Sequence, residues 1–161
     1  MDNFLESNLT ELYELSQEKL ALMKEILQIT REQESCIAED KLDTLGKTIN
    51  DKQLRIDRID ELDKEFNNIF SNIKDKYRVE SIDQLEDYDK VHVQKLQDCI
   101  AEIMSTIKEI IDIEKVNNDK VKTLKEKMAV NIKKVNQSKL INSAYSNAKA
   151  IQPSRFYDNK G

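Results

Sequence analysis

The chain has 161 residues, of which 35% are charged, and it contains only two glycines, one proline and no tryptophan. Because glycine and proline form the turns between strands, so few of them exclude a fold built from many short strands. With a net charge of −5 and 6% aromatic residues, the composition predicts an all-α fold: long antiparallel helices in a thin, coiled-coil-like bundle.

The distribution of charged residues, and the positions of proline and glycine, divide the chain into regions. Residues 121–161 carry nine basic and two acidic side chains, so this region is +7 and the other 120 residues are −12. Such asymmetry predicts a division of labour between the two parts. We predict one helical domain over residues 1–150 and a mobile tail over residues 151–161, where Pro153 and Gly161 lie.

The sequence also predicts where the protein resides. No apolar run approaches the roughly 18 residues that cross a bilayer, and the acidic N-terminus lacks a signal-peptide core. We therefore expect a cytoplasmic protein without stable membrane insertion. In that reducing compartment Cys36 and Cys99 are expected to be buried or half-buried apolar side chains.

The first predicted helix covers residues 3–37. Its apolar residues recur at spacings of three and four, and further ones widen the stripe, so we expect contact with more than one neighbouring helix. The narrow stripe consists of Leu5, Leu9, Leu12, Met23 and Ile26. The residues that widen it are Leu20, Leu27 and Ile29.

A second helix is predicted after Asp40, which is expected to be its N-cap. Its seam alternates spacings of three and four over five heptads, and only Lys52 and Asp63 interrupt its apolar character. The seam positions are Leu42, Leu45, Ile49, Lys52, Ile56, Ile59, Asp63, Phe66, Phe70, Ile73 and Tyr77.

A third helix is predicted from residue 82 to about 147, opened by a capping box of Ser81 and Gln84. Its seam keeps the same spacing from Val93 to Val135 and is polar at a few positions. At 1.5 Å per residue this helix would be roughly 100 Å long, twice the length of the first two. It therefore either overhangs its partners or breaks near Asn117. The polar seam positions are Glu114, Asn117 and Asn131.

Catalytic chemistry is not expected. The single histidine, His92, has no cysteine cluster beside it for a structural zinc site and is expected on the solvated surface. The chain also lacks a glycine-rich phosphate loop. We therefore predict no enzyme activity, no cofactor and no bound metal.

The basic stretch after residue 120 is predicted to contact protein. It lacks the interleaved aromatic residues of a single-strand nucleic-acid site, so we expect no nucleic-acid partner. Its lysines covering the acidic first two helices, or touching anionic lipid, are the alternatives. The candidate partner-binding stripe is Val121, Leu124, Met128 and Val135.

Three of the nine aromatic residues, Tyr145, Phe156 and Tyr157, lie in the last 17 residues. Aromatic side chains on a tail that buries nothing are natural anchors for a partner. The alternative is that they fold back onto the bundle.

The order of these features resembles the FlgN family of flagellar export chaperones over nearly the whole chain. The resemblance rests on the leading LTELYELSQEKLALMKEIL, the acidic turn AEDKLDTL and the second helix in LGKTINDKQLRIDRIDELDKEF. It continues in NQSKLINSAYSNA, which contains Asn142 and Tyr145, and in the aromatic tail FYDNKG.

The resemblance implies a chaperone that binds hook–filament junction proteins, also called hook-associated proteins, and delivers them to the cytoplasmic domain of the flagellar type III export gate. Carried over, it places cargo contact on the C-terminal helix, around Val121 to Val135. It places gate docking on Tyr145, helped by Phe156 and Tyr157. The alternatives from the residues alone are a structural coiled coil, or another helical adaptor or secretion chaperone, that forms a homo-oligomer through the third-helix seam.

Overall fold

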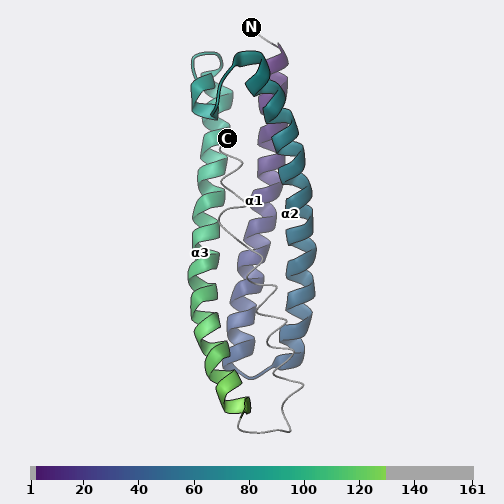
Figure 1. Ribbon diagram of the computed structural model, residues 1–161, viewed down its shortest axis with the longest axis vertical. Coiled ribbons are helices and arrows are strands. Elements are labelled where there is room, and N and C mark those ends of the chain that lie inside the picture. The colour runs from purple at the N-terminus through teal and green to yellow at the C-terminus, as the bar shows by residue number, and fades with distance from the viewer. Residues whose placement is uncertain (1–2, 130–161) are drawn as a thin grey trace.

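The computed structural model of the protein describes residues 3–129, which form three long helices and one short 3-10 helix (Figure 1). The elements are α1 (Asn3–Ala38), α2 (Leu42–Tyr77), η1 (Ile82–Leu85) and α3 (Lys90–Ala129). The predicted all-α fold is confirmed, and α1 and α2 cover the residues expected for the first two helices. The predicted tail, residues 151–161, and the domain end at residue 150 lie outside the described residues.

The helix α1 lies between the other two. Its wide apolar stripe packs against both α2 and α3 along the bundle, whereas the backbones of α2 and α3 hardly approach each other. Figure 1 shows α1 in the middle, with α2 and α3 on its two sides. Consecutive helices are antiparallel, so α1 and α3 run in the same direction. The prediction that the first helix contacts more than one neighbour is confirmed.

Buried side chains form three clusters along the bundle, and the predicted seams supply most of them. The first cluster, at the end where η1 lies, combines all three helices with η1. The second, in the middle, is built around Met23, Ile26, Ile56 and Ile103. The third, at the opposite end, consists of Cys36, Leu42, Leu45, Ile49 and Val121.

The turn between α1 and α2 differs from the prediction. Asp40 is not the N-cap of α2, because its φ of 59° places it in the left-handed region at the end of α1. The Lys41 amide donates to the Cys36 carbonyl at 2.8 Å, and the Asp40 amide donates to Ile37 at 3.4 Å. This pattern terminates α1 as a Schellman motif, a conformation that aspartate tolerates better than most residues. The N-cap of α2 is Lys41, which makes no side-chain capping bond.

The predicted start of the third helix at residue 82 is also wrong. Residues Ile82–Leu85 form only η1, and the Gln84 side chain accepts a bond from the Glu80 amide at 2.6 Å instead of closing a box with Ser81. The helix α3 begins at Lys90, where the Asp89 carboxylate accepts the His92 amide at 3.2 Å. Asp89 therefore supplies the N-terminal cap that the sequence pattern assigned to Ser81.

Near Asn117 the helix is continuous, so a break there is excluded. The helix α3 runs through Asn117 and Asn118 to Ala129 because both sides of this point are packed. Asn117 is buried beside α1, and Val121 is buried in the third cluster one turn later. Leu124 still packs partly against the third cluster, as does Ile37 at the end of α1. The predicted overhang falls on residues after Ala129, outside the described part of the chain.

The packing predicts that alanine substitution of two different leucines has very different effects on stability. Leu9→Ala removes a side chain that is 0% exposed in the first cluster, so the free energy of unfolding should fall by about 2–5 kcal/mol. Leu54→Ala is the matched control, because Leu54 is 67% exposed and should change stability by less than about 0.5 kcal/mol. Urea unfolding followed by circular dichroism measures both, and equal effects would contradict this assignment of the core.

Candidate partner-binding site

The end of the bundle that contains the third cluster carries the described part of the predicted partner-binding stripe. Val121 is only 3% exposed and packs with Cys36, Leu42 and Leu45. Leu124 is half-buried against the same cluster. The structure therefore does not present Val121 as a free surface in the isolated chain.

The other predicted site residues are less defined by the structure. Met128 belongs to α3, but its side chain is not among those described. Val135, Tyr145, Phe156 and Tyr157 lie outside the described residues. Their roles as cargo-binding and gate-docking residues stay predictions.

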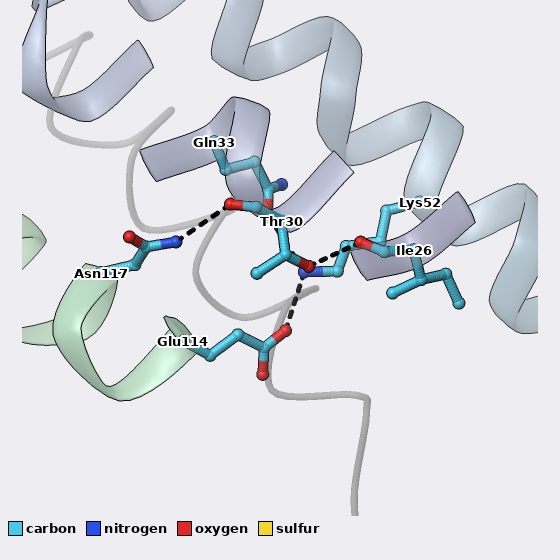
Figure 2. Close-up of polar contacts among 6 residues, drawn as sticks. All are labelled: Ile26, Thr30, Gln33, Lys52, Glu114 and Asn117. Atoms are coloured by element: carbon cyan, nitrogen blue, oxygen red, sulfur yellow. Dashed lines mark hydrogen bonds and ion pairs between the residues drawn. The ribbon is translucent and has the colours of Figure 1, made fainter. Parts of the chain in front are cut away.

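A polar layer separates the third cluster from the second. Lys52 is 0% exposed, and its ammonium Nζ donates to Gln33 Oε1 of α1 at 3.0 Å and to Glu114 Oε1 of α3 at 2.7 Å. Figure 2 shows the Lys52 and Glu114 side chains converging beside α1. One lysine of α2 thus connects all three helices inside the bundle.

Burial and ion pairing shift the pKa values of Lys52 and Glu114 in opposite directions. Removal from water is the main influence, and it raises the pKa of Glu114 and lowers the pKa of Lys52. The attraction between the two charges, and the hydrogen bond that joins them, partly offset both shifts. The short contact between the two groups therefore opposes, but does not cancel, the desolvation that disfavours both charged forms.

Asn117 completes the layer one turn beyond Glu114. Its Nδ2 donates to the Thr30 carbonyl at 3.4 Å, a long hydrogen bond, as Figure 2 shows. Its Oδ1 is buried, and among the described residues no group donates to it. An unsatisfied buried amide oxygen is unfavourable, so Asn117 attaches α3 to α1 only weakly.

A second buried ion pair lies closer to the η1 end of the bundle. Lys19 of α1 contacts Asp63 of α2 at 2.6 Å, and both side chains are largely buried. Desolvation lowers the pKa of Lys19, and Asp63 counteracts that shift. The two polar interruptions of the second-helix seam, Lys52 and Asp63, therefore each pair with a different helix.

Two surface clefts were not found from the sequence, and only the first of them adjoins the site. A cleft of about 350 Å³ separates the end of α1 from the last turns of α3. Another, of about 480 Å³, lies between η1 and α3 and is lined by Ile82, Ile100 and Met104 among others. Neither could be found from one helix alone, because each has walls from two elements. The first cleft is lined by Ile37, Ala38, Asp119, Lys120, Thr123, Leu124 and Lys127.

The remaining predicted features are placed as follows. His92 is half-buried, and its ring Nδ1 lies 3.0 Å from Asp89 Oδ1, so it belongs to the start of α3. Cys36 and Cys99 are both buried, as predicted, and burial raises the pKa of each thiol.

Within residues 3–129, no three His, Cys, Asp or Glu side chains are grouped to hold a metal ion. Across the same residues, no helix has the length and apolar character to span a membrane.

Together these features define an elongated helical bundle of coiled-coil type. The FlgN protein family model matches residues 1–153. The chain therefore belongs to the FlgN family, a family of flagellar export chaperones. No curated protein and no solved structure matches it.

The polar layer predicts strong coupling between Lys52 and Glu114. Lys52→Met or Glu114→Leu alone leaves one buried charge without its partner and should lower the free energy of unfolding by about 3–5 kcal/mol. The double variant replaces the pair by apolar side chains of similar size, so it should be at least as stable as the unmodified chain. A double-mutant cycle by urea unfolding measures the coupling, and additive losses would contradict the ion pair.

Proposed function

We propose that this chain is a cytoplasmic chaperone that binds hook–filament junction proteins and delivers them to the export gate. Membership of the FlgN family supports the chaperone role. The observation that carries the cargo-binding part is the position of Val121 and Leu124, which lie at the end of the bundle where few apolar side chains hold α3. It is a non-enzymatic role, in which the chaperone covers an apolar surface of its cargo until export.

The chemistry of this end fits an amphipathic cargo helix. The stripe of Val121, Leu124, Met128 and Val135 offers apolar anchors at helical spacing, which is helix-in-groove recognition. Exposed lysines flank it at Lys120, Lys122 and Lys127. Such charges chiefly raise the association rate and favour a cargo with acidic residues beside its apolar face.

Gate docking is proposed for a separate surface. Tyr145, with Phe156 and Tyr157 as helpers, follows the cargo-binding stripe in the sequence. Aromatic anchors bury a large area with few rotatable bonds, so a short segment can bind with them. Two surfaces would allow cargo and gate to be held together, as delivery requires.

Replacing the stripe should abolish cargo binding. Leu124→Asp/Met128→Asp would place two carboxylates against an apolar cargo helix, which is costly enough to remove the interface. The control Leu54→Asp/Lys64→Ala changes the net charge by the same amount at exposed positions of α2, away from the stripe, and should retain binding. Calorimetry with purified hook–filament junction proteins measures both, with circular dichroism to verify folding. Retained binding by the first variant would contradict the proposed stripe, and light scattering of the free chain tests the self-associating alternative.

Tyr145→Ala should separate the two surfaces. The variant keeps the apolar stripe, so its affinity for cargo should be unchanged. Its affinity for the cytoplasmic domain of the export gate should fall by about 2 kcal/mol or more, the loss typical of an aromatic hot spot. Tyr88→Ala is the control, because Tyr88 is an exposed tyrosine at the η1 end of the bundle. Loss of cargo by Tyr145→Ala would instead assign this residue to the cargo site.

A further inference from the structure

The last part of α3 is attached to the bundle more weakly than its middle. Between residues 99 and 110, α3 places four buried side chains in the second cluster: Cys99, Ile103, Ile107 and Ile110. Beyond Glu114, the side chains that the structure describes add only Val121 to the third cluster, with Leu124 packed partly against it. We call residues 114–129 the arm. Because apolar burial is the main source of attachment, the arm should open more readily than the rest of α3.

The polar layer lies at the root of the arm. Glu114 is the only residue of the arm among the described ones that forms an ion pair with α2, through Lys52 at 2.7 Å. A buried ion pair stabilises less than apolar packing of the same volume, because desolvation opposes the attraction. Opening the arm would return Glu114 and the unsatisfied Oδ1 of Asn117 to water. The favourable hydration of these two groups therefore offsets part of the free energy that is lost when opening breaks the contacts of the arm.

Closure of the arm conflicts with a binding role for Val121. That side chain is 3% exposed and covered by Cys36, Leu42 and Leu45, so no partner can contact it in the closed form. We propose that the arm opens as a unit about the Lys52–Glu114 layer, and that the partner helix binds Val121 and Leu124 of the open arm. The layer is thus a latch that sets how often the stripe is available. The identity of the partner rests on the proposed function, whereas opening is a property of the free chain.

The latch has a quantitative consequence. When only the open form binds, the apparent Kd equals the intrinsic Kd divided by the open fraction. A substitution that makes the open form n times rarer must raise the apparent Kd n-fold. The same substitution must slow amide exchange of the arm n-fold, because exchange also proceeds through the open form.

Hydrogen exchange of the full-length chain without partner tests the opening. Peptides from residues 118–129 should exchange faster than those from residues 99–110, although both segments lie in one continuous helix. Lys52→Met/Glu114→Leu replaces the latch by apolar packing and should slow exchange of the arm by about tenfold or more. Asn117→Leu removes the unsatisfied amide and should act in the same direction, which guards against failure of one variant to fold.

A matched control uses the other buried pair. Lys19→Met/Asp63→Leu makes the same kind of replacement between α1 and α2, away from the arm. It should leave exchange of residues 118–129 unchanged. Binding of purified hook–filament junction protein, measured by calorimetry, should weaken for both latch variants by the factor found in exchange and remain unchanged for the control.

The outcomes separate the latch from the proposed function. Equal protection of the two segments in the free chain, or latch variants that do not slow exchange of the arm, would overturn the latch. Slower exchange with an unchanged Kd would overturn binding to the open arm. A wild-type chain that binds no junction protein would contradict the proposed function, and exchange would still decide whether the arm opens.

Discussion

The bundle depends on the apolar surface that α1 presents in two directions. The helices α2 and α3 each pack on α1, while their own backbones hardly approach each other. This arrangement requires a stripe wider than a two-helix seam, and α1 provides it through half-buried residues on both sides of its buried row. Residues such as Leu15 and Leu22 extend the row on one side, and Leu20 and Leu27 on the other. Without this width, only a two-helix hairpin would remain.

Besides the apolar clusters that α2 and α3 share, a pair of long polar side chains joins these two helices directly. Lys52 reaches from α2 to Glu114 of α3 and also bonds Gln33 of α1. A shift of α3 by one heptad would place Ile107 or Val121 where Glu114 now lies, and Lys52 would then be buried without a counter-charge. The cost of such a charge makes the observed register the favourable one. The pair thus contributes more to alignment than to net stability.

The same layer limits the apolar packing of α3. Seam positions that would otherwise hold isoleucine or leucine carry Glu114 and Asn117, so two successive contacts with α1 and α2 are polar. In a chaperone of the FlgN family, a helix that packs moderately on its own chain is well suited to exchange that packing for contacts with another protein. Both packings would use the same apolar side chains, because an amphipathic helix buries its stripe against any complementary helix.

The sequence by itself determined the all-α class, the extent of α1 and α2, and most buried positions, because hydrophobic periodicity is a local property of each helix. It also carried the family resemblance. Only the tertiary structure decided that Val121 is covered and that Lys52 and Asp63 pair with different helices, since partners across a bundle are not local in sequence. The tertiary structure likewise decided where helices end and begin. Asp40 has a left-handed backbone conformation at the end of α1, and Asp89, not Ser81, caps the start of α3. Several residues in each turn have suitable side chains, and the packing of the three long helices selects which backbone conformation connects them.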